Sequence, residues 1–222
     1  SNSIDLSTSF YGTTNDIVSF SWGRAPGYFD VVAYTGTGSA RTVAHNLGVV
    51  PEMMWVKRRS GVNNWTIYAG DATDLLRLNT TDATADGDFA WNDTAPTSSV
   101  FTVASHNLVN GSGEKYIAYL FATLAGVSKV GSVSHSGSST DVDCGFSSGA
   151  SFVLLKRIDA EGGWYVWNSV RGIVAGNDPY LFLDDTAAEV TNTDLIDPLS
   201  SGFTITGDFT DGTYLFYAIA AI

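Results

Sequence analysis

The stretch Met53-Met54-Trp55-Val56-Lys57-Arg58, four large apolar residues followed by a Lys-Arg pair, occurs twice in this chain in related form. The second version is Phe152-Val153-Leu154-Leu155-Lys156-Arg157, which begins 99 residues later. Trp65 and Trp164 follow at the same offset of 99, each at the start of a short aromatic and β-branched run. A long period that preserves a Trp and a Lys-Arg pair in the same order indicates an internal duplication.

The offset between the two copies drifts by a few residues further along the chain. Matching positions there are Leu76 to Leu78 with Leu181 to Leu183 at 105, Pro96 and Phe101 with Pro198 and Phe203 at 102, and Tyr116 with Tyr214 at 98. The drift falls in polar segments, where surface loops tolerate insertions. We therefore expect two domains of the same fold at residues 28–125 and 127–222, joined directly through Ala125-Gly126.

The N-terminal residues carry a third, partial copy of the pattern. Val18 to Trp22 resembles Ile117 to Phe121, again at an offset of 99, and Phe10 takes the place of Phe101. Residues 1–27 are therefore predicted to be a partial repeat, the closing hairpin of a preceding unit. Two and a fraction units indicate either that the chain was cut from a longer array or that this hairpin completes a sheet elsewhere.

The composition favours strands over helices. The chain has 19 Asp, 4 Glu and 23 Gly, and Asp and Gly favour turns whereas Glu favours helices. No window of 11 or more residues combines helical apolar spacing with good caps. Short Val, Ile, Tyr, Phe and Trp runs alternate with Gly, Asn, Asp and Ser clusters, which predicts antiparallel strands. The expected fold is all-β: two tandem antiparallel β-sandwich domains, each with roughly seven or eight strands.

Charge and hydropathy exclude several partners. Lys and Arg number 11 against 23 Asp and Glu, a formal charge of −12. Nucleic-acid binding and basic membrane-surface helices both need the opposite balance. The longest uncharged apolar stretch, Tyr116 to Ser128, has 13 residues, and a spanning helix needs about 20. Ser1 to Ser9 lacks the basic and apolar regions of a signal peptide. We expect no nucleic-acid partner, no membrane insertion and no signal peptide.

Reactive side chains form no convincing catalytic or metal-binding pattern. His45, His106 and His135 are too far apart in sequence for a short zinc motif, so we expect polar loop histidines. Cys144 follows the acidic Asp143, which does not favour a thiolate. Acidic clusters lie in turn segments without EF-hand spacing: Asp82, Asp86 and Asp88, then Asp141 and Asp143, and Asp184 with Asp185. The sequence predicts no catalytic residue, no metal and no cofactor.

Aromatic side chains that could stack on sugars are the remaining candidates for a site. Trp65 and Trp164 recur inside matching strands, which favours a core role in both domains. Trp91 has no aromatic counterpart in the second copy and precedes the turn residues Asn92 and Asp93, so we expect it to be exposed. Tyr68 and Trp167 lie opposite the presumed core face and come next. The candidate glycan-binding residues are Trp91, Asn92, Asp93, Tyr68 and Trp167.

Several runs of this chain resemble a repeat of roughly 100 residues found in virion proteins of tailed phages, mostly marine, that are labelled tail fibre or structural protein. These runs are Phe29 to Gly38, Arg41 to Gly48, Pro51-Glu52, Val56 to Arg59, Trp91 to Phe101 and Tyr116 to Tyr119. The resemblance covers nearly the whole chain. It is weaker in the second copy, where Ser147 and Ala150 replace Gly48 and Pro51.

The resemblance implies a non-enzymatic virion structural protein, tail-fibre-like or another external component, that contributes to host-surface adhesion. It implies other virion proteins as partners and a virion location after synthesis in the bacterial host cytoplasm. Phage fibres are commonly homotrimers, so a homotrimer is expected, although no coiled-coil heptads enforce it. Two alternatives stay open: a carbohydrate-binding adhesin for host surface glycans, and a polysaccharide depolymerase that uses an Asp pair.

Overall fold

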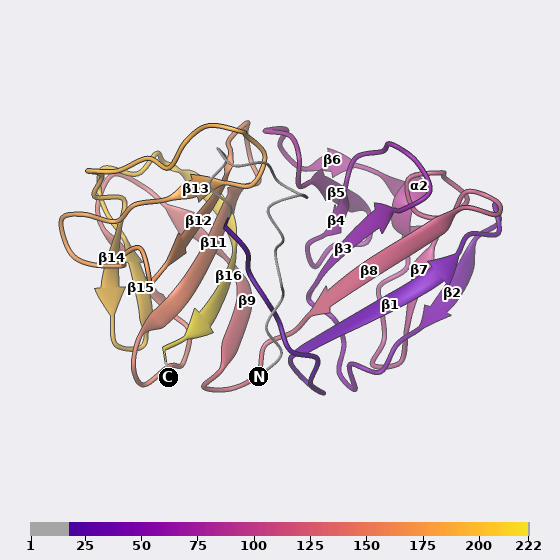
Figure 1. The fold of residues 1–222 in the computed structure, drawn as a ribbon, viewed down its shortest axis with the longest axis horizontal. Coiled ribbons are helices and arrows are strands. Elements are labelled where there is room, and N and C mark those ends of the chain that lie inside the picture. The colour runs from indigo at the N-terminus through magenta and orange to yellow at the C-terminus, as the bar shows by residue number, and fades with distance from the viewer. Residues whose placement is uncertain (1–17, 222) are drawn as a thin grey trace, which may run out of the picture.

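The computed structural model describes residues 18–221, which form two lobes built almost wholly of antiparallel strands (Figure 1). The first lobe contains β1 (Phe29–Thr35), β2 (Arg41–Ala44), β3 (Met53–Arg58), β4 (Thr66–Tyr68), β5 (Asp74–Arg77), β6 (Ala85–Asp86), the helical turn α2 (Asp88–Trp91), β7 (Val100–Val103) and β8 (Lys115–Phe121). The second lobe contains β9 (Ser128–His135), β10 (Thr140–Asp143), β11 (Ala150–Arg157), β12 (Trp164–Asn168), β13 (Leu181–Phe182), β14 (Ile196–Leu199), β15 (Gly202–Ile205) and β16 (Gly212–Ala220). The expected all-β class is confirmed.

The same strand order recurs in both lobes. The larger sheet of the first lobe runs β1-β8-β3-β4-β5-β6, and that of the second runs β9-β16-β11-β12-β13. The smaller sheets run β2-β7 and β10-β15-β14. The strand registers carry the offsets found in the sequence: Ile67 lies opposite Leu76, and Val166 lies opposite Leu181. Each lobe is therefore a two-layer sandwich with one connectivity.

Each sandwich begins with the same tight turn. The Ala25 N–H donates to the Phe29 carbonyl at 3.0 Å, and the Leu124 N–H donates to the Ser128 carbonyl at 3.1 Å. Gly27 and Gly126 occupy the left-handed region in these turns, with φ of 73° and 72°. Glycine adopts this backbone at little cost because it has no Cβ. The second turn leads directly from β8 into β9, so the connection between the sandwiches is short.

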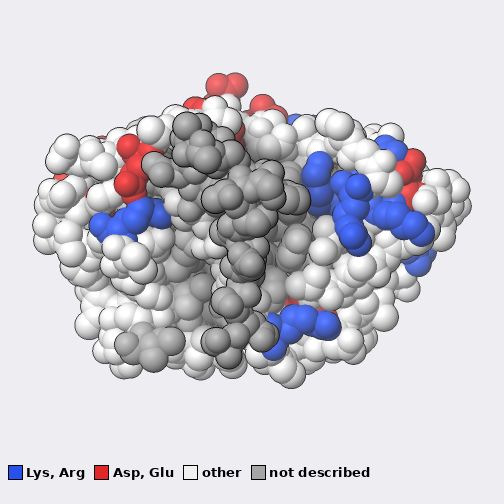
Figure 2. All heavy atoms as spheres, in the orientation of Figure 1, with Lys and Arg blue, Asp and Glu red and all other residues white. Residues whose placement is uncertain are grey.

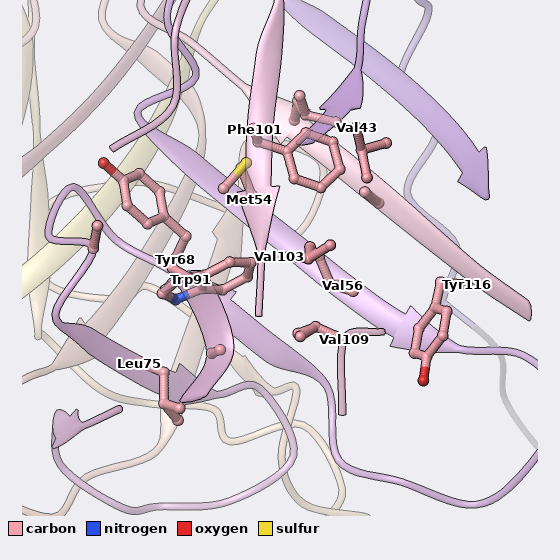
Figure 3. Packing of buried hydrophobic residues seen from close by; sticks show 14 of the residues in the cluster. Val43, Met54, Val56, Tyr68, Leu75, Trp91, Phe101, Val103, Val109 and Tyr116 are labelled. Atoms are coloured by element: carbon pink, nitrogen blue, oxygen red, sulfur yellow. The ribbon is translucent and has the colours of Figure 1, made fainter. Parts of the chain in front are cut away.

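Each sandwich has its own apolar core between its two sheets. Alternate residues of a strand point to opposite faces, so Met54 and Val56 of β3 enter the first core with Phe101 (Figure 3). Val153 and Leu155 of β11 enter the second core in the same way. These central strands carry nearly continuous apolar runs because their other face is also covered.

The outer faces of the two larger sheets pack against each other in a third apolar cluster. Met53 and Trp55 contribute from β3, and Phe152 and Leu154 contribute from β11, at the equivalent positions. The interface is therefore isologous, with the same face of each sandwich buried against the other. Trp164 belongs to this cluster and Trp65 packs at its border, so the prediction that both lie in the sandwich cores is wrong.

The segment before β1 differs from the predicted hairpin. Residues 18–24 contain no strand, and the rest of the predicted hairpin, including Phe10, lies outside the described residues. Phe20 and Trp22 instead pack against the cluster between the sandwiches, where the indigo segment runs between the lobes in Figure 1. The segment resembles β8 in sequence because both place alternate aromatic side chains on apolar surface.

Candidate functional site

The predicted exposed ring, Trp91, is buried. Its relative exposure is 1%, and its ring meets that of Tyr68 edge-to-face at 5.8 Å (Figure 3). The indole Nε1 donates to the Asp74 carbonyl at 3.1 Å. The turn α2 rotates the side chain into the first core, which the neighbouring turn residues did not indicate. The prediction that Trp91 is exposed is therefore wrong.

The other predicted glycan-contacting rings are also in the cores. Tyr68 is 3% exposed, and Trp167 is fully buried and stacked on Tyr165 at 5.5 Å. Tyr68 and Trp167 were predicted to face away from the core, but they point into the cores of the first and second sandwich. Asn92 and Asp93 are exposed, with φ of 56° and 47°. None of the three predicted rings is exposed beside Asn92 and Asp93. Contact of Asn92 and Asp93 with a glycan stays a prediction.

An aromatic cleft lies at one end of the interface between the sandwiches. It holds about 330 Å³, and seven of the eight described residues that line it are aromatic. They include Trp22, Trp55, Trp65 and Tyr119. Trp65 is half-buried and stacks on Tyr119 at 6.0 Å with 30° between the rings. Sequence reasoning could have found Trp65 by its recurrence, but placed it in a core.

Phe20 and Trp22, in the segment before β1, line this cleft and also a neighbouring groove, so this segment forms a partition between the two. The Trp22 ring lies edge-on to Trp55 at 6.2 Å and to Phe152 at 6.0 Å, so it contacts both sandwiches. Phe20 meets Phe152 edge-to-face at 5.4 Å. Such edge-to-face pairs are favourable arrangements of aromatic quadrupoles. The partition is therefore held by specific ring contacts with both lobes.

A second groove of about 580 Å³ lies on the other side of this partition. It combines the apolar Phe20, Phe152 and Ile219 with polar residues of the β12–β13 loop and the N-terminal segment. The guanidinium of Arg171 lies over the Phe20 ring at 5.9 Å and pairs with Glu189 at 2.8 Å. In the part of the chain that the structure describes, no Asp or Glu lines this groove or the aromatic cleft.

Trp55 leaves a polar atom unpaired behind the cleft wall. Its side chain is 93% buried, being 7% exposed, and among the described residues its Nε1 has no hydrogen-bond partner. By contrast, the buried Trp91, Trp164 and Trp167 each donate Nε1 to a backbone carbonyl. Buried donors are normally satisfied because leaving one unmade costs free energy. Within residues 18–221, the Trp55 Nε1 is therefore a buried donor without a partner.

Hydrogen bonds around Lys156 connect the two sandwiches at another part of the interface. The Lys156 Nζ donates to the Thr81 and Gly162 carbonyls, and Trp164 Nε1 donates to the Arg77 carbonyl at 2.9 Å. Lys156 is fully buried, and this burial lowers the pKa of its ammonium to about 8. Its repeat equivalent, Lys57, remains half-buried and donates to the Asn63 carbonyl.

The two Lys-Arg pairs differ in the surroundings of the lysine. Arg58 and Arg157 pair with the acidic Glu114 and Asp159. Lys156 does not extend to solvent, because the first sandwich covers it. The charged side chains in view in Figure 2 are mostly basic on the lobe of the first sandwich.

The remaining reactive groups lie away from the cleft. Cys144 is buried, and burial raises the pKa of its thiol to about 12, which disfavours a nucleophilic thiolate. His45 lies in a loop, as expected, and is buried. His135 is also buried but ends β9 instead of lying in a loop. Within residues 18–221, no three His, Cys, Asp or Glu side chains are placed to hold a metal ion. No helix in this part of the chain is long and apolar enough to cross a membrane.

The fold and the cleft define a class of protein: two β-sandwiches packed face to face, with an aromatic cleft at the open end of their interface. The chain belongs to the family described as Domain of unknown function (DUF7483), whose profile matches residues 7–221. The match spans both sandwiches, so the family unit contains the duplication. No curated protein and no solved structure matches the chain.

Proposed function

We propose that this protein is a non-catalytic structural module of a phage virion, in a tail fibre or another external component, and that it contributes to attachment to the host surface. The resemblance of its repeat to virion proteins is the origin of this proposal. The observation that carries it furthest is the isologous interface, which joins two sandwiches into one block. External virion parts must keep their shape without chaperones, and such a block suits that task.

The interface provides both apolar burial and directional contacts. Fully buried side chains in it include Met53, Trp164 and Tyr217, and each such side chain contributes on the order of 1.5 to 3 kcal/mol. Backbone bonds also cross it, from Gly162 N–H to the Thr81 carbonyl at 2.9 Å. These contacts oppose relative motion of the two sandwiches, which supports a structural role in the virion.

Immunogold electron microscopy of phage particles tests the proposal. Antibodies raised against this chain are applied to purified virions of a phage that encodes it, and peptides of the chain are sought in the same particles by mass spectrometry. The proposal expects labelling of an external part of the particle. Detection in infected-cell lysate but not in purified virions would overturn it.

A carbohydrate-binding adhesin is the second candidate function, and the aromatic cleft favours it. Stacked and partly exposed rings such as Trp65 and Tyr119 are suited to the apolar faces of sugars. The depolymerase alternative needs two carboxyl groups roughly 5 to 10 Å apart beside the bound sugar. Among residues 18–221 no carboxylate lines either groove, so the described lining favours binding over hydrolysis.

A further inference from the structure

The two tryptophans at equivalent strand positions have different surroundings. Trp164 is fully buried, and its Nε1 donates to the Arg77 carbonyl of the other sandwich at 2.9 Å. Trp65 is half-buried, lines the aromatic cleft and stacks on Tyr119. The same repeat position is therefore enclosed in the second sandwich and partly open to the cleft in the first. Trp164 thus shows how this repeat position looks when it is fully buried, and Trp65 differs from it by being partly exposed.

Polar groups border the rings on the far side of the partition. The groove there is lined by Ser19, Ser21, Asn168 and Ser169, of which all but Asn168 are exposed. The Asn168 Oδ1 accepts the Arg171 N–H at 3.0 Å, which leaves the amide NH₂ as a donor. The segment 18–22 therefore separates a ring-lined pocket from a groove rich in hydroxyl and amide groups.

Charge bears on the ligands that this arrangement can take. Among the described residues that line the two grooves, Arg171 is the one ionic side chain, and Glu189 pairs with it at 2.8 Å. In a chain with a formal charge of −12, an anionic ligand is repelled at long range. The described lining thus offers no free ion pair to a charged ligand, and its hydroxyl and amide groups match a neutral one.

We propose that the aromatic cleft and the adjoining groove form one binding site for a neutral oligosaccharide chain. A sugar ring offers C–H groups on its face and hydroxyls at its edge. The faces would stack on Trp65 and Tyr119, and the hydroxyls would bond Asn168 and the serines. Ligand pockets of a few hundred Å³ with aromatic walls and a few polar groups are typical of small-molecule sites.

This inference rests on the proposed function, because it names the ligand through which the protein would contribute to attachment.

Binding is measured by isothermal titration calorimetry on the full chain. The probes are neutral hexasaccharides (α- and β-linked glucans and a mannan), an anionic uronate hexasaccharide and an aromatic-rich peptide. We expect binding to at least one neutral hexasaccharide, with no comparable heat from the uronate or the peptide.

Variants locate the site. Trp65→Ala is expected to weaken binding about tenfold or more, since it removes the stacking face, and Trp65→Phe is expected to recover part of the loss. Ser169→Met adds bulk in the groove from an exposed position and is also expected to weaken binding. Val62→Ala is the matched control, because Val62 is fully exposed three residues before Trp65. Circular dichroism confirms the fold of each variant.

The outcomes separate this inference from the proposed function. Absence of binding to every neutral hexasaccharide, preference for the uronate or the peptide, or equal binding by wild type, Trp65→Ala and Ser169→Met would each overturn the inference. Presence of the chain in virions would leave the proposed function standing in those cases. Saccharide binding by a chain that is missing from virions would overturn the proposed function alone.

Discussion

Lys156 makes the stability of this protein depend on pH in a way that the structure specifies. Its ammonium lies fully buried between the sandwiches, about 5.8 Å from the Trp164 ring, and donates to two carbonyls. Burial lowers its pKa from 10.5 to about 8, against the opposing effect of Asp184, Asp82 and Glu161. The folded protein therefore releases this proton more readily than the unfolded chain.

The sign and size of the effect follow from linkage. Between pH 8 and 10.5 the unfolded chain binds more protons at this residue than the folded protein, so stability rises with pH. Below pH 8 the cost of burying the charge is nearly constant. Over the interval from pH 7 to pH 9.5, the free energy of unfolding is expected to gain about 2 kcal/mol from Lys156.

Comparison with a variant isolates this contribution, because other groups titrate in the same range. Burial also raises the pKa of the Cys144 thiol and of several tyrosines, which lowers stability as pH rises. These effects cancel in the difference between wild type and Lys156→Met. Urea unfolding followed by circular dichroism at pH 7, 8, 9 and 9.5 measures that difference.

The free energy of unfolding of wild type minus that of Lys156→Met is expected to rise by about 2 kcal/mol from pH 7 to pH 9.5. At pH 7 the variant has two opposing effects: it removes a buried charge, and it leaves the Thr81 and Gly162 carbonyls without their donor. Lys57→Met is the matched control for loss of the lysine at the equivalent repeat position, because Lys57 keeps contact with solvent. A flat difference for Lys156→Met would refute the reasoning.

Three further predictions concern the cores and the turn between the sandwiches. Trp91→Ala is expected to lower the free energy of unfolding by about 3 to 5 kcal/mol, since it empties a core position; a loss under about 1 kcal/mol in urea unfolding would mean that the ring is exposed. Burial raises the pKa of Asp178 to about 6, so wild type should lose about 2 kcal/mol relative to Asp178→Asn between pH 4 and pH 7, and parallel pH profiles would contradict this. Gly126→Ala should cost about 1 to 2 kcal/mol because its φ is 72°, whereas Gly23→Ala, with open space and no positive φ, should be neutral; equal effects of the two would argue against the turn.

Local patterns were sufficient to predict the strands and the duplication. The apolar run at Met53 to Val56 predicts a strand covered on both faces, and β3 is such a strand. The pattern does not reveal what covers the second face, because apolar residues look alike whether they face a sheet of their own domain or another domain. Trp65 and Trp164 were assigned to the cores for that reason.

The surroundings of Trp91 and Lys156 depend on parts of the chain that local patterns do not reveal. Trp91 stands beside turn residues, and only the single helical turn α2 directs its ring inward. Lys156 lies near the end of an apolar strand, where a lysine normally extends to water, but the loop that contains Thr81 of the other sandwich covers it. The aromatic cleft combines residues from the N-terminal segment, β1, β3, β8 and the residue before β4, which no short motif could bring together.

The face-to-face packing of the sandwiches is tested most directly at the indole N–H of Trp164. Nuclear Overhauser spectroscopy on protein with ¹⁵N-labelled tryptophan measures which protons lie near it. Because Nε1 donates to the Arg77 carbonyl at 2.9 Å, we predict cross-peaks from this indole proton to Arg77 and Leu78 and slow exchange with solvent. An indole proton that exchanges freely and shows no contact with residues of the first sandwich would contradict the interface.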